Sequence, residues 1–243
     1  MTNLYRLSSS LDALLRSADA ALRVIGKGED DHFYGAWVGG SAAEGGHPAS
    51  QFKPREASAA EFNQHYAPLD GRQGEAVNGY TREEYAYING QLRGYYEAPE
   101  SVGLLSSQLT RGGIEARVAS LDAAMQPLPS DVILHRGMQI EWEAEDGAAT
   151  SILESGDVGE FGIEDGFLSA SLSRDISQIQ DGDFEVELLV PAGTPSVWAK
   201  PYSANPGEQE VILGRGLRVE IQDYQPSGGL GGKPLVVAKV SKP

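Results

Sequence analysis

The sequence predicts an α+β fold in which a helical N-terminal half packs on a mixed or antiparallel β-sandwich. In the first half of the chain, apolar residues recur at the spacing of an α-helix. After residue 129 they occur instead in short runs rich in β-branched residues, which are typical of strands. Because helices do not alternate with these runs, a doubly wound parallel sheet is not expected. We expect one domain over residues 1–243, with a mainly helical lobe at 1–128 and a β-rich core at 129–243.

The helical half begins with an amphipathic segment. Apolar residues recur over residues 7–25, serines at 8–10 are available as caps, and Gly26 is placed to end the helix. Glycine, proline and polar residues dominate residues 27–79, so we expect loops pinned by aromatic side chains there. Within that stretch, a short helix is expected near residues 58–66.

Two further helices are expected before the strands. Thr81 and Glu84 have the spacing of a capping box, which predicts a helix that starts at Thr81 and carries an apolar stripe through residues 85–92. Residues 114–125 form another apolar stripe, and Pro127 soon afterwards cannot continue a helix. The pattern therefore places the last helix just before the β-rich half.

The second half is expected to contain seven short strands separated by turn signals. Glycines at 228, 229, 231 and 232 mark one such turn, and the Lys233-Pro234 pair after them is wrong for a phosphate-binding loop, which should open a helix. The strands are expected at residues 132–134, 167–171, 184–190, 197–200, 210–213, 217–221 and 235–240.

The excess of acidic residues indicates which kinds of macromolecule the protein can bind. The 243 residues include 19 lysines and arginines against 35 aspartates and glutamates, which gives a formal net charge of -16. Such a surface repels phosphate backbones, so a nucleic-acid partner is not expected and a basic partner fits better. The acidity also has a simple alternative explanation, because net charge of either sign keeps a protein in solution.

Several kinds of site are excluded by residue content. The chain has no cysteine, which excludes disulfides, thiolate nucleophiles and cysteine zinc sites. Its four histidines lack metal-ligand spacing, so no metal is expected. No run approaches the ~18 apolar residues that cross a bilayer, and the first residues do not read as a secretory signal. We therefore expect a cytoplasmic protein without a membrane partner.

Polar side chains lie on the faces of three predicted strands. Read with a period of two, the strand near residue 134 ends its apolar face in Arg136. Ser169 and Ser171 share a face of the next strand, and Glu208 and Glu210 share a face of a later one. Taken singly, each has an ordinary explanation: a strand-end charge, a solvated face, or a charged edge that discourages aggregation.

Four segments, in order, resemble the arginine-serine-glutamate class of mono-ADP-ribosyltransferases, which includes bacterial toxins and phage-encoded host-modifying enzymes. The resemblance extends over residues 81–240. It implies a β-rich core that binds NAD, and transfer of ADP-ribose from NAD to a protein acceptor. The segments are TREEYAYINGQLR at 81–93, LDAAMQPLPSDVILHRGMQ at 121–139, GFLSASLS at 166–173 and VPAGTPSVWAKPYSANPGEQEVIL at 190–213.

The resemblance implies how NAD is held and cleaved. Arg136 would grip the phosphates with its planar guanidinium, and Gly137 and Ser171 would also contact NAD. Glu210 would bond the ribose and stabilise the positive charge that develops as nicotinamide leaves. Ser169 would orient Glu210 by a hydrogen bond.

The resemblance also implies the acceptor. In this family a glutamate at the position of Glu208 accompanies arginine modification, whereas a glutamine accompanies asparagine modification. Glu208 would orient the acceptor guanidinium and accept its proton, and Tyr202 would meet the acceptor. Residues 137–173 contain no lysine or arginine and many carboxylates, and would draw in a basic surface or simply form a solvated loop.

Some positions depart from the family pattern, and other functions stay open. Gln180 stands where many relatives have an aromatic residue that stacks on nicotinamide, so either Phe184 replaces it or nicotinamide is held differently. Ala170 replaces a threonine on the face opposite Ser169. The alternatives are an NAD glycohydrolase, in which water replaces the acceptor, and a catalytically silent scaffold that binds a basic protein.

Overall fold

The computed structural model describes residues 52–94, 111–138 and 158–242. The helix expected at residues 7–25 lies outside the described residues, and so do residues 139–157 of the carboxylate-rich stretch 137–173. The described helices of the N-terminal half are α2 (Ala59–His65), α3 (Gly71–Gly79), the π-helical turn η1 (Tyr80–Glu84), α4 (Tyr85–Leu92) and α5 (Arg111–Ala124).

A mixed sheet of nine described strands forms the second half, in the order β1-β6-β7-β4-β2-β5-β9-β8-β3. The pair β5 and β9 is parallel, and the other described pairs are antiparallel. The α+β prediction is confirmed. The strands are β1 (Gln126–Pro127), β2 (Val132–Met138), β3 (Phe161–Glu164), β4 (Leu168–Ser171), β5 (Phe184–Val190), β6 (Pro195–Trp198), β7 (Glu210–Leu213), β8 (Leu217–Gln225) and β9 (Leu235–Ser241); short helices α7 (Ser177–Asp181), η3 (Pro206–Glu208) and η4 (Leu230–Gly232) lie between them.

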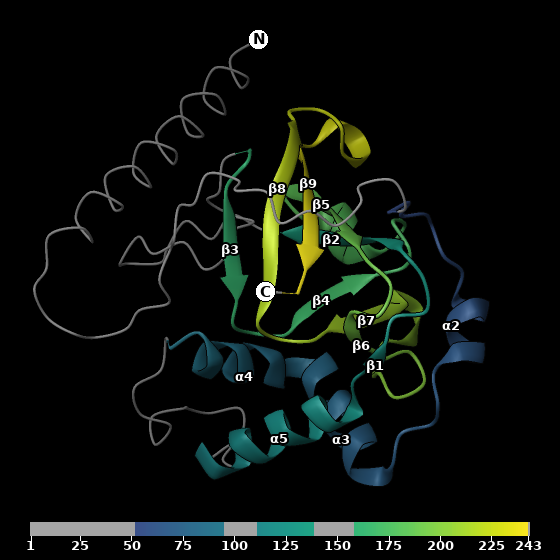
Figure 1. Ribbon diagram of the computed structural model, residues 1–243, viewed down its shortest axis with the longest axis vertical. Coiled ribbons are helices and arrows are strands. Elements are labelled where there is room, and N and C mark those ends of the chain that lie inside the picture. Colours follow the sequence, from purple (N-terminus) through teal and green to yellow (C-terminus); the bar gives the residue numbers. More distant parts are fainter. Residues whose placement is uncertain (1–51, 95–110, 139–157, 243) are drawn as a thin grey trace, which may run out of the picture.

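The sheet bends into two halves that face each other. Between β2 and β4 the register contains a single pair, His135 with Ser171, whereas β2 and β5 pair along seven positions. The sheet bends at this narrow junction. One half consists of β1, β6, β7 and β4, and the other consists of β2, β5, β9, β8 and β3 (Figure 1). The predicted sandwich is thus one continuous sheet with a narrow junction.

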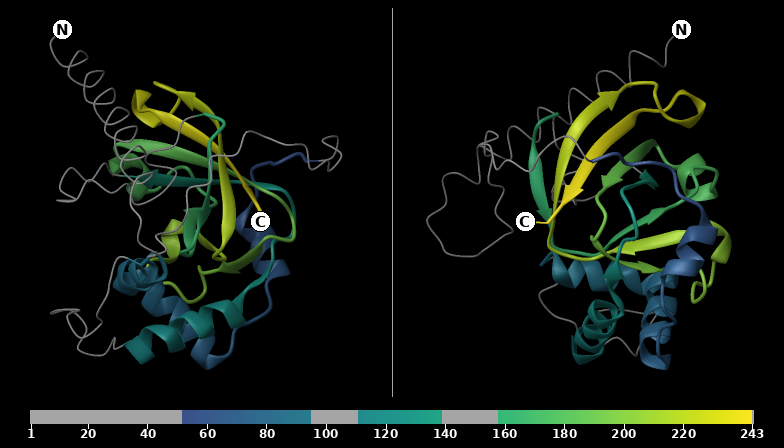
Figure 2. Two further views of the ribbon diagram at one scale, coloured as in Figure 1. Left: turned by 60° about the vertical axis from the view of Figure 1, so that its left-hand side comes forward. Right: turned by 45° about the vertical axis from the view of Figure 1, so that its right-hand side comes forward.

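Two apolar clusters hold the described parts together. The first lies between the two halves of the sheet and includes Leu134, Leu188, Val211 and Val219, with Phe62 of α2 against Trp198. The second lies between the β4-β7-β6 layer and helices α3 to α5, which Figure 2 shows on the outer side of that layer. The layer is therefore buried on both faces, and all four residues of β7 are buried.

The helices differ from expectation at one point. The short helix near residues 58–66 and the helix over residues 114–125 are confirmed, but the start at Thr81 is wrong. The helical run begins at Gly71, where Asp70 accepts hydrogen bonds from two backbone N–H groups and Gln73 completes the capping box. Thr81 donates to the Asn78 carbonyl instead, inside the run. The loops expected up to residue 79 are therefore wrong over α3.

The strand positions follow the predicted runs, but several short elements were not expected. The bounds of β5 and β7 agree with those predicted, while β2 and β8 extend further. The unexpected elements are the strands β1 and β3 and the short helices α7, η3 and η4. The strand β3 lies at the edge of the sheet with Ile163 46 % exposed, so it lacks the apolar run by which the other strands were identified. No described helix is both long and apolar enough to cross a membrane.

Candidate active site

Arg136, Ser169 and Glu210 lie together at the centre of the sheet. They come from the adjacent strands β2, β4 and β7. The Ser169 hydroxyl donates a hydrogen bond to Oε1 of Glu210, and Arg136 Nη1 donates to the Ser169 carbonyl at 2.6 Å. The structure therefore brings together three side chains that the sequence separates widely.

The alternation of side chains along β4 explains why Ser169 faces Glu210. Phe167 and Ile212 pack in the helical cluster, whereas Leu168 and Ala170 pack between the halves of the sheet. Ser169 is paired with Ile212 across the ladder, so its side chain shares the helix-facing side with Glu210, two residues before Ile212. The two faces predicted for β4 are confirmed, and Ala170 is indeed on the face opposite Ser169.

Burial governs the charge of Glu210. The residue is 8 % exposed, and this burial raises the pKa of its carboxyl above the ordinary value. The hydrogen bond from Ser169 opposes this rise, the negative charge of Glu208 adds to it, and the positive charge of Arg136 opposes it. Ser169 and Arg136 thus both favour the ionised carboxylate.

Two buried atoms of this cluster lack partners. Nε of Arg136 and Oε2 of Glu210 have no hydrogen-bond partner among the described residues. A buried polar group left unpaired costs free energy, so such groups in a native fold call for a ligand or another explanation. A guanidinium with a spare donor and a carboxylate with a spare acceptor suit the phosphates and ribose hydroxyls of a dinucleotide.

Glu208 approaches this cluster from a turn rather than from a strand. It lies in η3, and Gln209 has φ 49°, in the left-handed region, so the extended alternation assumed for Glu208 and Glu210 is wrong. The turn is tied to β4, because the Ser171 hydroxyl donates to the Glu208 carbonyl at 2.6 Å. Glu208 nevertheless lies near enough for its charge to raise the pKa of Glu210.

A cavity of about 440 Å³ lies beside the cluster, between two loops. One loop follows β4 and the other precedes β7. Arg136, Ser169 and Glu210 are not among the lining residues, so the cavity adjoins the cluster rather than containing it. The lining residues are Asp175, Ile176, Ala204, Asn205, Pro206, Gly207 and Glu208.

Tyr202 anchors the loop before β7 on helix α3. Its hydroxyl accepts a hydrogen bond from the Leu69 N–H at 2.7 Å, and its carbonyl accepts one from Asn78 Nδ2 at 2.7 Å. The ring lies against Gly74, where a Cβ atom would stand 3.0 Å from Tyr202 Cδ1. The side chain expected to meet the acceptor is thus half-buried against the helical lobe.

A buried polar network that the sequence analysis did not identify holds the start of β4. Asn89 Oδ1 accepts from the Phe167 N–H at 2.9 Å, and Asn89 Nδ2 donates to the Phe167 carbonyl at 3.0 Å. The Tyr80 hydroxyl donates to the same carbonyl at 3.1 Å. Arg93 is paired with Glu164 at 2.9 Å just upstream. The sequence signal that could have identified Asn89 and Arg93 is the segment 81–93, in which they belong to an Ile-Asn and a Leu-Arg pair that resemble the family.

The remaining expected residues lie around this centre. Gly137 follows Arg136 on β2 and pairs with Glu185. Phe184 is packed in the core between the halves of the sheet, whereas Gln180 is exposed and donates to Asp175 Oδ1 at 2.5 Å. Neither position therefore identifies, among the described residues, an aromatic ring that stacks on nicotinamide.

Comparison with known proteins identifies the family. The family model described as "ADP-ribosyltransferase exoenzyme" matches residues 58–241, which is most of the chain. The chain belongs to this family. No curated protein sequence matches significantly. The resemblance inferred from the four sequence segments is therefore confirmed, and the enzyme is an NAD-dependent ADP-ribosyltransferase.

Solved structures of the family share the fold. The C3 exoenzyme of Clostridium limosum superposes with a TM-score of 0.58 at 23% identity, over 75% of this chain and 92% of that one. The toxin Plx2a of Paenibacillus larvae gives 0.55 at 21% identity, over 75% and 90%. C3stau2 of S. aureus, solved with NAD, gives 0.54 at 20% identity, over 76% and 97%. The enzyme therefore has the fold of bacterial ADP-ribosylating toxins.

Proposed function

We propose that this ADP-ribosyltransferase modifies an arginine side chain, and that Arg136, Ser169, Glu208 and Glu210 carry out the transfer. The observation that carries the proposal is the contact of Ser169 with Glu210 beside Arg136, with Glu208 on the wall of the neighbouring cavity. A carboxylate next to a fixed cation suits a substrate that has two phosphates and becomes positively charged at its sugar.

The proposed binding of NAD uses the two unpaired atoms. Arg136 holds the phosphates, and Oε2 of Glu210 accepts a hydrogen bond from the ribose bearing nicotinamide. As the bond between ribose C1′ and nicotinamide lengthens, the ionised Glu210 stabilises the oxocarbenium character of the sugar, and neutral nicotinamide leaves with the bonding electrons. Ser169 keeps the carboxylate in place and favours its ionised form.

The proposed acceptor step uses Glu208. A free guanidinium has a pKa of ~12.5 or more and is a poor nucleophile until a carboxylate orients it and removes a proton. A guanidino nitrogen then bonds to ribose C1′, and Glu208 takes the proton that this nitrogen loses. Support comes from the position of Glu208, which lines the cavity and lies close enough to Glu210 to change its pKa.

Labelled NAD tests this proposal. The protein is incubated with NAD carrying a label on the ADP-ribose half, with and without agmatine, which carries the arginine side-chain guanidinium without a peptide backbone. Labelled agmatine supports the proposal, and Glu208→Gln should abolish it while leaving cleavage of NAD by water. Free ADP-ribose as the sole product would instead identify an NAD glycohydrolase, and no turnover would indicate a binding module.

A further inference from the structure

A second cluster of polar side chains lies on β2 and β5, on the face that points away from the core between the halves of the sheet. Leu134 and Val186 pack in that core. Because side chains alternate along a strand, His135, Glu185 and Glu187 share the other face, and His135 is paired with Glu187 across the ladder. The side chains of His135 and Glu185 are each 1 % exposed, and Glu187 is half-buried. One nitrogen or oxygen atom from each of the three lies within 4.8 Å of the other two.

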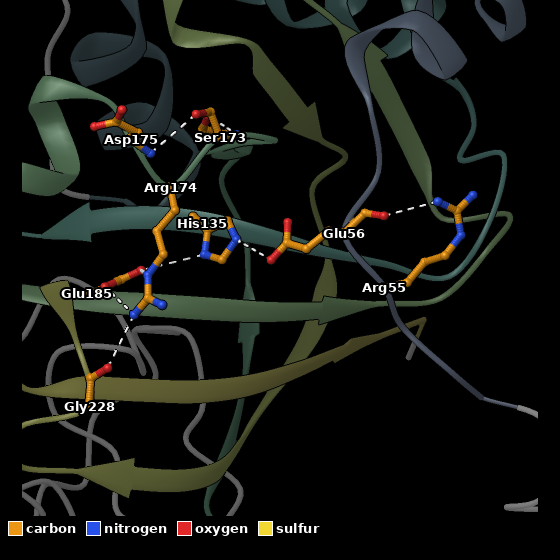
Figure 3. A network of polar contacts seen from close by, with 9 residues as sticks. Arg55, Glu56, His135, Ser173, Arg174, Asp175, Glu185 and Gly228 are labelled. Atoms are coloured by element: carbon orange, nitrogen blue, oxygen red, sulfur yellow. Dashed lines mark hydrogen bonds and ion pairs between the residues drawn. The ribbon is translucent and has the colours of Figure 1, made fainter.

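The contacts of His135 leave the lone pair of one ring nitrogen unused. Nε2 lies 3.0 Å from Oε1 of Glu56 (Figure 3), and because an ionised carboxylate can only accept, this contact assigns a proton to Nε2. Nδ1 is buried and has no hydrogen-bond partner among the described residues. In the neutral ring Nδ1 is an acceptor, yet it lies 3.5 Å from Oε1 of Glu185. Two acceptors therefore face each other at a buried position.

The hydrogen bonds of Glu185 leave a site free on the same oxygen. An ionised carboxylate offers roughly four lone-pair sites, two on each oxygen. Arg174 donates from Nε to Oε1 at 2.5 Å and from Nη2 to Oε2 at 3.0 Å, and the Leu230 N–H donates to Oε2 at 3.0 Å. The remaining site is on Oε1, which is also the oxygen nearest to Nδ1 of His135. Buried lone pairs that face one another call for a positively charged partner between them.

The distance between these two atoms distinguishes a proton from a metal ion as that partner. A second proton on His135 would form a charge-assisted hydrogen bond to Glu185, which has a length of about 2.7–2.9 Å. Two ligands that each bind one ion at ~2.1 Å, with the tetrahedral angle between them, lie ~3.4 Å apart instead. The 3.5 Å between Nδ1 and Oε1 matches the second arrangement.

The charges around this position also favour a cation. The hydrogen bond with Glu185 raises the pKa of Arg174, and the negative charges of Glu185, Glu187 and Glu56 add to this rise. Three carboxylates thus act on one region that holds a single guanidinium among these residues. A histidine that binds a metal typically donates its other ring N–H to a carboxylate, as His135 does to Glu56.

We propose that His135, Glu185 and Glu187 bind a divalent transition-metal cation of the zinc type between strands β2 and β5. Nδ1 of the imidazole and one oxygen of each carboxylate are the ligands, a mixture that suits zinc, and water completes the tetrahedron. The cation has a structural role: through the bonds of Glu185 with Arg174 and Leu230, it ties β2 to the loop after β4 and to the turn before β9. The chain has no metal-ligand spacing here, because the ligands meet only when the two strands pair.

Zinc alone tests this inference. The metal-free enzyme is titrated with zinc chloride in a buffer without phosphate or chelator, and binding is followed by calorimetry. One equivalent should bind, and the melting temperature should rise with the zinc concentration, because a ligand that binds only the folded state stabilises it. The affinity should fall as the pH is lowered, because protons compete for the histidine nitrogen.

Matched variants locate the bound zinc. His135→Gln removes the imidazole ligand and should abolish binding, and Glu56→Gln removes the carboxylate behind the imidazole and should weaken it about tenfold or more. Glu61→Gln, which alters a nearby exposed carboxylate that is paired with Arg55, should bind zinc as the wild type does. If His135→Gln does not fold, Glu187→Gln at its half-buried position replaces it and should also weaken binding at least about tenfold.

Three outcomes would overturn the inference. They are the absence of zinc binding by the wild type, equal affinities of the wild type and the ligand variants, and loss of the bound equivalent in His65→Ala. The last variant alters an exposed histidine, so that outcome would reveal an adventitious surface site. Because these measurements include neither NAD nor an acceptor, they do not depend on the proposed arginine transfer.

Discussion

Ser169 and Glu210, which are 41 positions apart in the chain, are joined by a hydrogen bond from the serine hydroxyl to Oε1 of the carboxylate. The bond leaves Oε2 buried and without a partner among the described residues. One oxygen of the carboxylate is thus held by the protein while the other stays available. The free energy and the pKa of Glu210 therefore depend on its burial and on its bond with Ser169.

Replacing Glu210 with glutamine should strongly reduce catalysis and raise stability. Loss of one preorganised group that faces developing charge lowers turnover about 10²- to 10³-fold, measured with labelled NAD. Because burial raises the folded-state pKa of Glu210, its ionised form is destabilising above that pKa. Glu210→Gln should therefore melt at a higher temperature than the wild type at neutral pH, and the difference should vanish below pH ~4, where the carboxyl is protonated in both states. A lower melting temperature at pH 7 would contradict this account.

The acid limb of the pH profile should move in opposite directions in two variants. NAD cleavage requires ionised Glu210, so the rate rises with pH through its raised pKa. Ser169→Ala removes a contact that lowers this pKa and should move the limb to higher pH. Glu208→Gln removes a negative charge that raises it and should move the limb to lower pH. The ratio of kcat to KM for NAD hydrolysis, measured against pH, checks both; a shift of both limbs in one direction would contradict the assignment.

Filling the space at Gly74 should displace Tyr202. A Cβ atom there would stand 3.0 Å from the tyrosine ring, whereas one at Gly71 on the same helix meets nothing within 4 Å. Gly74→Leu should therefore push the loop before β7 off α3 and reduce transfer to the acceptor about tenfold or more, with NAD hydrolysis largely retained. Gly71→Leu is the matched control. Equal activity of the two variants would show that the loop does not depend on this contact.

Removal of the Asn89 side chain should weaken both the fold and the site. Its amide satisfies the N–H and the carbonyl of Phe167, two residues before Ser169. Asn89→Ala leaves the Phe167 N–H unpaired, while the Phe167 carbonyl keeps its bond from Tyr80. This should lower the free energy of unfolding by about 1–3 kcal/mol and also reduce NAD hydrolysis. Denaturant unfolding and the hydrolysis assay measure the two effects. A variant within ~0.5 kcal/mol of the wild type would contradict the proposed role of the network.

Local patterns were enough to identify much of the fold and the centre of the site. The alternation of side chains along a strand correctly placed Ser169 and Ala170 on different faces of β4. Each face packs in its own apolar cluster. The apolar runs of β5 and β7 also gave the correct bounds. What placed Arg136 beside Ser169, however, was the family resemblance, since no local pattern specifies which strands are neighbours.

Other features depended on geometry that residue types do not reveal. Gln209 takes a left-handed conformation without being glycine, so nothing in the sequence signalled that Glu208 leaves the strand. The Thr81–Glu84 pattern lies inside the helical run, and the helix starts instead after Asp70, whose carboxylate accepts hydrogen bonds from two backbone N–H groups. The pairing of Arg174 with Glu185 arises only when β5 and the loop after β4 come together in space.

The single backbone pair between His135 and Ser171 has a mechanical consequence. Arg136 stands on one side of that junction, while Ser169 and Glu210 stand on the other. A dinucleotide whose phosphates bind Arg136 and whose ribose binds Glu210 would span the junction and hold the two halves of the sheet together. Bound NAD should then slow amide hydrogen exchange along β2 and β4, whereas free nicotinamide, which is too short to reach both sides, should leave that exchange unchanged.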